Sequence, residues 1–123
     1  MNTRSTLATA VVLFVALLHL GFLVLEMFLW STPIGRRVFG LPPEVMRTSA
    51  SLAANQGLYN GFLAAGLTWG VTLGAAGFSV RVFFLVCVVV AGVFGAVTAK
   101  RSILFIQAIP GAIALVLTYL SRG

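Results

Sequence analysis

The chain has 123 residues, of which 60% are hydrophobic and only 8% are charged; its mean hydropathy of +1.10 is typical of an integral membrane protein and excludes an ordinary soluble domain. Eight Lys and Arg residues against two acidic residues give a formal charge of +6, but no basic stripe with interleaved aromatic residues occurs, which excludes a nucleic-acid partner. Cys87 is the single cysteine, so neither a disulfide within the chain nor a cysteine-based metal site is available.

Four windows of the sequence are long and apolar enough to cross the membrane, since about 30 Å of hydrocarbon takes roughly 20 helical residues. We therefore predict an all-α membrane protein, a compact bundle of four transmembrane helices with short connections. The predicted spans are residues 7–30, 53–76, 82–99 and 102–120. We expect a single domain over residues 1–123 and an uncleaved first helix, because no signal-peptide cleavage motif follows that helix.

The connection over residues 31–52 is the most polar part of the chain. Pro33 disfavours helical geometry in the residue before it, and Gly35 permits a turn, so the first span is expected to end there. Pro43 fits the first turn of a new helix, and Glu44 favours the positive end of that helix. A helix is therefore expected to begin near Pro43 at the membrane surface and to run on into the second span.

Glycine and alanine recur at four-residue spacing in the second and third spans. In lipid, such small residues let helix backbones approach closely and gain van der Waals contacts. The pattern predicts tight packing between helices and accounts for these residues without a functional role. Pro110, in the fourth span, removes one backbone donor and is expected to kink that helix.

The first span carries the stretch HLGFLVLEMFLW, which includes two ionisable residues, His19 and Glu26. They are seven residues apart, so on a helix they share a face at a separation of about 10 Å in height. A bare charge in the bilayer is costly, so each group needs a partner from another helix, a water or a ligand. We therefore predict His19 and Glu26 as acid–base residues, and Trp30, one turn further on, as a ligand-binding aromatic.

The start of the second span, NQGLYNGF, has a high density of hydrogen-bonding side chains for a membrane helix. Its polar residues are Asn55, Gln56, Tyr59 and Asn60. If the first two spans form an antiparallel hairpin, these residues lie at the depth of Glu26, and we predict all of them as ligand-binding. Gln107 in the fourth span is a further predicted lining residue, because it lies about one turn in from the same side of the membrane.

A purely structural role is the alternative for each of these residues. Glu26 can reach water or fix packing through hydrogen bonds, His19 can be a packed core residue, and the amides can simply join helices. One His and one Glu on a shared face fall short of a metal ligand set, so no metal site is predicted. The chain has no Asp, which excludes a Ser-His-Asp triad, and no glycine-rich phosphate loop or other sign of a cofactor occurs.

Basic residues at the predicted span ends set the expected orientation. The residues on one side are Arg36, Arg37, Arg47, Lys100 and Arg101, and those on the other are Arg4, Arg81 and Arg122. By the positive-inside rule, five against three places the 31–52 connection in the cytoplasm and both termini outside. Because this excess is small, insertion in both orientations is an alternative.

The blocks HLGFLVLEMFLWSTPIGRRVFGL and NQGLYNGFLAAGL resemble the uncharacterised bacterial membrane family called domain of unknown function 1304. In length and hydropathy the resemblance covers essentially the whole chain. It implies a small bacterial membrane protein with four helices, and we expect a multi-pass protein of the inner, cytoplasmic membrane. The family brings no established activity or substrate to these residues.

Three functions fit the sequence, and in each of them the lipid bilayer is a partner of the protein. The first is an intramembrane site for a small lipophilic molecule, in which His19 and Glu26 transfer a proton and the polar residues of the second span orient the ligand. The second is proton-coupled export by a homo-oligomer, since the chain is similar in size and span count to small multidrug resistance transporters, which also place one glutamate in their first helix. The third is a structural or accessory subunit that docks a partner helix. Whether the protein is an enzyme stays open.

Overall fold

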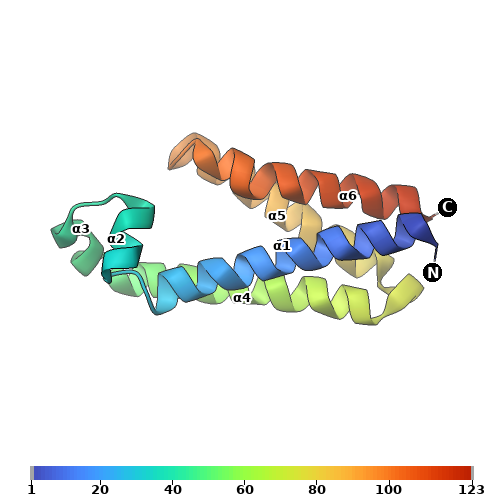
Figure 1. Ribbon diagram of the computed structural model, residues 1–123, viewed down its shortest axis with the longest axis horizontal. Helices are drawn as coiled ribbons and strands as arrows, with labels where there is room; N and C mark the ends of the chain where they lie inside the picture. The colour runs from blue at the N-terminus through green and yellow to red at the C-terminus, as the bar shows by residue number, and fades with distance from the viewer. Residues whose placement is uncertain (1, 123) are drawn as a thin grey trace. The chain divides into compact units, whose positions relative to one another are not determined.

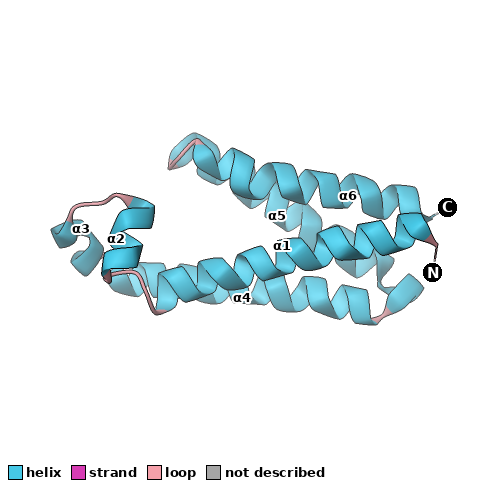
Figure 2. Ribbon diagram, in the orientation of Figure 1, coloured by secondary structure: helices cyan, strands magenta, loops and turns pink. Residues whose placement is uncertain are grey.

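The computed structural model describes residues 2–122, which form six α-helices, a 3-10 turn and a π-helical turn, with no strand among them. The helices are α1 (Thr3–Met27), α2 (Pro33–Phe39), α3 (Pro43–Thr48), α4 (Ala50–Thr72), α5 (Phe78–Thr98) and α6 (Ile109–Arg122). Short loops join them (Figure 1, Figure 2). The prediction of an all-helical chain is confirmed.

The described residues contain three helical segments that are long and apolar enough to span a membrane, which are Thr3–Met27, Gly74–Thr98 and Leu104–Arg122. They correspond to the predicted first, third and fourth spans, and they fit a membrane protein. The helix α4 takes the place of the predicted second span and is 23 residues long, but Asn55, Gln56 and Asn60 lower its hydropathy below that of the other segments. The count of four spans therefore stays a prediction.

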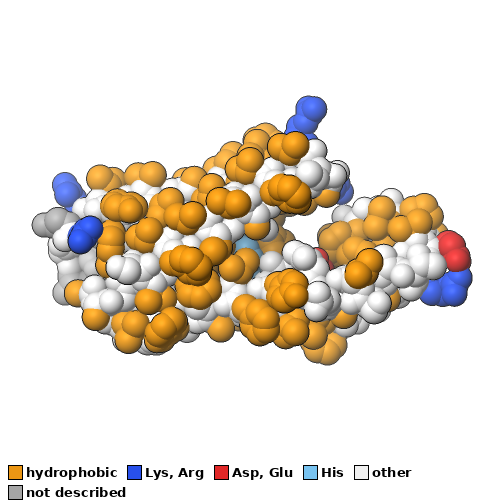
Figure 3. Space-filling model, turned by 180° about the vertical axis from the view of Figure 1, so that it is seen from behind, with side chains coloured by type: hydrophobic (Ala, Val, Ile, Leu, Met, Phe, Trp, Pro, Cys, Tyr) orange, Lys and Arg blue, Asp and Glu red, His pale blue; other side chains and the backbone are white. Residues whose placement is uncertain are grey.

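The chain forms two compact units. The terminal unit combines the chain up to Leu17 with the part from Leu63 onward, and the hairpin unit is Leu18–Phe62. Hydrophobic side chains cover much of the face drawn in Figure 3, as expected for helices surrounded by lipid. The single domain over residues 1–123 stays a prediction.

The terminal unit has an aliphatic core to which α1, α4, α5 and α6 all contribute. The buried residues of this core are Val12, Val15, Ala16, Ala64, Leu67, Leu85, Val88 and Ala114. Small residues set the spacing of α5 and α6, as the sequence pattern predicts. A Cβ atom on Gly92 would lie 2.8 Å from the backbone nitrogen of Ala108, just before α6, and one on Gly111 of α6 would lie 2.8 Å from Cγ1 of Val88 on α5, so both glycines leave no room for a side chain between the packed segments.

A π-helical turn, Leu104–Ala108, precedes α6. In this turn the backbone N–H of Ile109 donates to the carbonyl of Leu104, five residues back instead of four. Pro110 follows directly and has no N–H of its own, so a regular helical ladder cannot continue through it. The irregularity that the sequence predicts at Pro110 takes the form of this wider turn.

The connection from α4 to α5 is a 3-10 turn, Gly74–Gly77, with Gly74 in the left-handed region at φ 60°. Arg81 closes the connection, because its Nη1 donates to the carbonyls of Gly70 and Gly74 at 2.8 Å each. These carbonyls belong to the last turn of α4 and the residues after it, where helical partners run out. The sequence suggested Arg81 only as a residue that sets topology.

The hairpin unit joins the end of α1 to the start of α4 through α2 and α3. The first span ends at Met27, earlier than predicted. Gly35 was predicted in a turn and instead lies inside α2, which begins at Pro33. The helix predicted near Pro43 does begin there, but it ends at Thr48 before α4 starts. The polar connection is therefore mostly helical.

Candidate functional site

The structure pairs one polar residue of α1 with one of α4 inside the hairpin unit. Asn60 donates a hydrogen bond from Nδ2 to Oε1 of Glu26, with 2.5 Å between the two atoms. Asn60 is only 6% exposed, and Glu26 is partly buried. The two residues are 34 positions apart in the sequence, so this contact helps to fix how two helices meet. The two polar clusters of the sequence thus meet through one residue from each.

Two glycines let α1 and α4 come close enough for this hydrogen bond. A Cβ atom on Gly57 would lie 2.7 Å from Cγ of Met27 and 3.2 Å from the carbonyl oxygen of Leu23. A Cβ atom on Gly61 would lie 2.7 Å from Cδ1 of Leu23. Real Cβ atoms essentially never lie within 3.0 Å of a neighbour. Gly57 and Gly61 therefore belong to the site as well as to the packing pattern, a role that we did not derive from the sequence.

His19 lies on the same face of α1 as Glu26, two helical turns before it. Its side chain is fully buried, and its ring meets the ring of Phe22 edge-on, with 5.3 Å between the centroids. Seven residues of helix separate His19 from Glu26, which is a rise of about 10 Å. This separation does not suit a direct hydrogen bond between the two side chains.

The other polar residues of the α4 cluster are exposed, unlike Asn60. Asn55, Gln56 and Tyr59 are exposed, whereas Gly57 and Asn60 are buried. The helical repeat of about 3.6 residues places Asn55 and Tyr59 on the side of α4 opposite Gly57, because each is two positions from it, whereas Gln56 lies one turn before Asn60 at the edge of the buried face. Of the four predicted residues, the structure brings Asn60 to Glu26, and a ligand role for the other three stays a prediction.

Trp30 joins the end of the first span to the two helix ends that follow. Its indole Nε1 donates to the carbonyl of Met46 at 3.0 Å and to Oγ of Ser49 at 3.2 Å, and its ring lies 4.5 Å from that of Phe39. No sequence pattern indicated these contacts, which link residues 16 and 19 positions apart without any repeat. The ligand role predicted for Trp30 stays a prediction.

Gln107 lies in the terminal unit, within the π-helical turn. Its Nε2 donates to the backbone carbonyl of Val88 at 3.1 Å. This bond joins the start of the last helical segment to α5, which is a packing role. A part for Gln107 in ligand binding stays a prediction.

The carboxyl group of Glu26 stands apart from other charged side chains. The second acidic residue of the chain, Glu44, is exposed and forms an ion pair with Arg47 on α3. Within residues 2–122, Glu26 has no such ion pair, and its hydrogen-bond donor is the neutral amide of Asn60. The same part of the chain contains no group of three or more His, Cys, Asp or Glu side chains that could hold a metal ion. The site therefore offers a carboxyl group with an uncharged donor.

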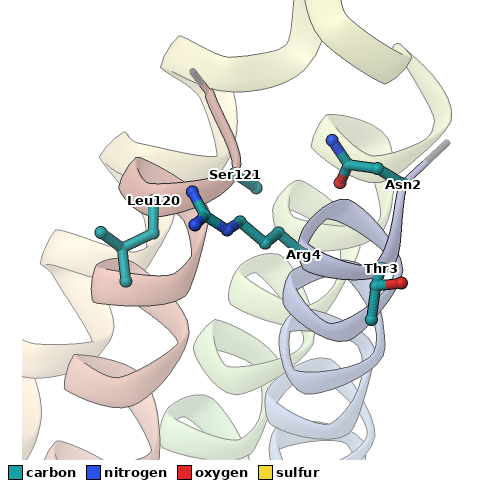
Figure 4. A pocket seen from close by; sticks show the side chains of 5 residues that line it. All are labelled: Asn2, Thr3, Arg4, Leu120 and Ser121. Atoms are coloured by element: carbon teal, nitrogen blue, oxygen red, sulfur yellow. The ribbon is translucent and has the colours of Figure 1, made fainter.

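An open pocket of about 320 Å³ lies in the terminal unit, where α1 begins and α6 ends (Figure 4). Its lining residues are Asn2, Thr3, Arg4, Leu120 and Ser121. The Arg4 side chain extends from α1 toward the α6 residues in this view. None of the predicted site residues lines this pocket, and its one ionisable side chain has no titrating neighbour in the lining. We assign it no catalytic part.

Comparison with known proteins gives a family for the chain. Residues 13–119 match the family described as "Protein of unknown function (DUF1304)". The chain is also similar to the uncharacterized protein YpaA of Lactococcus lactis subsp. lactis (strain IL1403), with 28% identity over 109 residues that cover 87% of this chain and 92% of that protein. No solved structure matches the chain. The matched residues include both sequence blocks that carry the resemblance, and the chain belongs to the family of unknown function DUF1304.

Proposed function

We propose that the hairpin unit contains an intramembrane polar site that binds a small lipophilic molecule and exchanges a proton with it. The Glu26–Asn60 contact carries this proposal. Glu26 lies in a segment long and apolar enough to span a membrane, where an ionisable side chain is costly and marks a functional site by default. A single neutral donor leaves the carboxyl group able to hydrogen bond with a bound molecule, or to give it a proton.

The chemistry that this arrangement supports is proton transfer with two acid–base groups. Glu26 is the first donor or acceptor, Asn60 positions its carboxyl group, and His19 is the second group. A molecule that extends over two helical turns, about 10 Å, reaches both, and the Leu23 side chain between them offers an apolar contact. An isomerisation, in which one group removes a proton and the other returns it, fits this layout.

The decisive experiment compares the two acidic residues of the chain. The wild type, Glu26→Gln, His19→Ala and Glu44→Gln are purified in a mild detergent, and co-purifying small molecules are identified by native mass spectrometry. We expect a lipid or lipophilic metabolite that Glu26→Gln and His19→Ala lose and that Glu44→Gln keeps, because Glu44 is exposed and paired with Arg47. Equal retention by wild type and Glu26→Gln would rule out this site.

We further infer that α4 crosses the membrane as a fourth span and that the 31–52 connection faces the cytoplasm. Twenty-three residues of helix extend about 35 Å, which exceeds the hydrocarbon thickness. The excess of basic residues on the side of the connection supports the orientation. In a Cys87→Ala background, a membrane-impermeant maleimide added to intact cells should label Ser79→Cys and not Arg36→Cys. Labelling of both positions from one side would contradict the fourth span.

A second candidate function is proton-coupled export of lipophilic cations by a small homo-oligomer. One observation favours it, namely that the carboxyl group of Glu26 has no cationic side chain beside it within the described chain, so an organic cation could take that place. Fluorescence titration with a lipophilic phosphonium ion should then show binding that weakens at low pH and disappears in Glu26→Gln. A purely monomeric protein without such binding would remove this candidate.

A further inference from the structure

The connection between α1 and α4 has a fixed shape rather than that of a loose loop. Trp30 donates hydrogen bonds to Met46 and Ser49, and its ring packs on Phe39. Met46 is only 1% exposed. These contacts hold α2 and α3 against the ends of the helices that they connect, so the outer side chains of both keep a defined arrangement.

The ends of α2 are equally well defined. The Thr32 hydroxyl oxygen accepts a hydrogen bond from the backbone N–H of Gly35 at the start of the helix, which is N-capping. Gly40 ends the helix in the left-handed region at φ 66° and donates its N–H to the carbonyl of Arg36. Gly35 packs against backbone carbonyls of the preceding turn. One edge of α2 is thus turned inward, and the rest of the helix faces outward.

The outward surface of α2 has an apolar edge and a basic edge. Ile34 and Val38 are 52% and 47% exposed, and they share a face because they are one helical turn apart. Arg36 is two positions from each, so it projects about 160–200° away from that apolar edge. Arg37 is also exposed. A helix with this division is typical of segments that lie in the plane of a membrane surface.

The two arginines of α2 are available for an external partner. In the described part of the chain neither Arg36 nor Arg37 has an ion pair, whereas Arg47 on α3 pairs with Glu44. The apolar edge continues past α2 with two further exposed residues, Leu41 and Val45. Positive charge above an apolar stripe complements a layer of phosphate groups above acyl chains.

We propose that α2 and the residues after it form a docking surface for anionic phospholipid headgroups, which we call the α2 surface and define by Ile34, Arg36, Arg37 and Val38. The apolar pair enters the boundary of the acyl chains, and the arginines bind headgroup phosphates. The first span ends at Met27, only a few residues before α2, which places this surface where the chain leaves the hydrocarbon. The proposal does not depend on the site at Glu26.

The test uses the second adjacent basic pair of the chain, Lys100 and Arg101, as its matched control. Wild type, an Arg36→Gln/Arg37→Gln double variant and a Lys100→Gln/Arg101→Gln double variant are mixed with equal amounts of phosphatidylglycerol and phosphatidylcholine in micelles, and bound lipids are counted by native mass spectrometry. We expect the wild type to retain mainly phosphatidylglycerol. The number of bound phosphatidylglycerol molecules should fall at least about fivefold in the Arg36/Arg37 variant and change little in the control. Equal losses in both variants, or equal retention of the two lipids by the wild type, would overturn the proposal.

A second measurement stands even if the arginine variant folds poorly. In nanodiscs that contain phosphatidylglycerol, and with Cys87 replaced by Ala, we expect Ile34→Cys to react with a water-soluble maleimide at least about fivefold more slowly than Arg36→Cys, because only the apolar edge is buried in lipid. In detergent-free phosphatidylcholine nanodiscs the difference should shrink. Equal reaction rates in the phosphatidylglycerol discs would overturn the proposal.

Discussion

The terminal unit and the hairpin unit place their polar groups in different ways. In the described part of the terminal unit, side chains that donate hydrogen bonds donate to backbone carbonyls, as Thr118 does to Ala114 and Gln107 does to Val88. In the hairpin unit, Asn60 donates to another side chain, Glu26, on a different helix. The core of the terminal unit is aliphatic, whereas the buried residues of the hairpin unit include His19 and Asn60.

This difference bears on where a ligand can bind. A side chain bonded to a backbone carbonyl of its own helix is satisfied wherever that helix goes, and the carbonyl keeps its helical N–H partner with or without the side chain. A bond between two side chains on different helices can be exchanged for bonds to a third molecule, because an amide and a carboxyl group each offer further donor or acceptor positions. Under the function proposed above, the side-chain pair of the hairpin unit is therefore the contact that a ligand would replace.

The largest loss of stability should come from a substitution at Gly57, which lets the two helices of the hairpin unit pack closely. In Gly57→Ala the new Cβ would meet Met27, Glu26 and the backbone of Leu23 at 2.7 to 3.2 Å. We expect a loss of about 1–3 kcal/mol in the free energy of unfolding, measured by denaturant titration in detergent with tryptophan fluorescence as the signal.

The matched control for that variant is Gly21→Ala on α1, where an added Cβ would meet nothing within 4 Å. Alanine is the better helix former, so this change should leave stability unchanged or raise it by up to about 1 kcal/mol. If both variants lost the same stability, the result would contradict the close contact of α1 and α4 at Gly57.

A smaller loss is expected when the side-chain pair itself is removed. Asn60→Ala deletes the donor to Glu26 and should cost about 0.6–1.7 kcal/mol, the range measured for hydrogen bonds between membrane helices. Asn55→Ala, an exposed amide on the same helix, should stay within about 0.5 kcal/mol of wild type. A double-mutant cycle with Glu26→Gln isolates the pairwise energy, and a coupling near zero would mean that the pair does not hold the hairpin.

Much of the fold was predictable because hydrophobicity over 20-residue windows depends on composition alone. The predicted first, third and fourth spans overlap Thr3–Met27, Gly74–Thr98 and Leu104–Arg122, and the start of α3 at Pro43 follows from local geometry. The helical state of residues 33–39 was not predicted. Its ends carry local signals, namely the Thr32 cap, Pro33 at the first position and Gly40 at the end, whereas the contact of Trp30 with Met46 that packs this region leaves no periodic trace in the sequence.

The candidate site was predictable in its residue types and only partly in its geometry. The spacing predicted His19 and Glu26 two helical turns apart on one helix, and of the α4 cluster expected at the depth of Glu26 the structure brings Asn60 to it. Spacing could not give the rotation of α4 about its own axis, which selects Asn60 and turns Tyr59 outward. That rotation is set by the close approach at the glycines of α4, whose neighbours are known only once the helices are packed.

In the terminal unit, removing the amide of Gln107 should lower stability less than removing that of Asn60. Gln107→Leu removes its bond to the Val88 carbonyl and should cost about 0.5–1 kcal/mol. The other glutamine of the chain, Gln56, is exposed, so Gln56→Leu should not lower stability in detergent. Equal losses would show that the change of residue type, and not the contact with α5, decides the outcome.

The smallest effect is expected at Thr118, which is 1% exposed and as buried as the polar residues of the hairpin unit. Its hydroxyl donates to the carbonyl of Ala114, four residues back on the same helix, and that carbonyl keeps its place in the helical ladder when the hydroxyl is removed. Thr118→Val, similar in volume, should therefore stay within about 0.5 kcal/mol of wild type in the same titration. A loss as large as that of Asn60→Ala would mean that burial alone makes a polar group costly to remove, and that bonds between helices are not what distinguishes the hairpin unit.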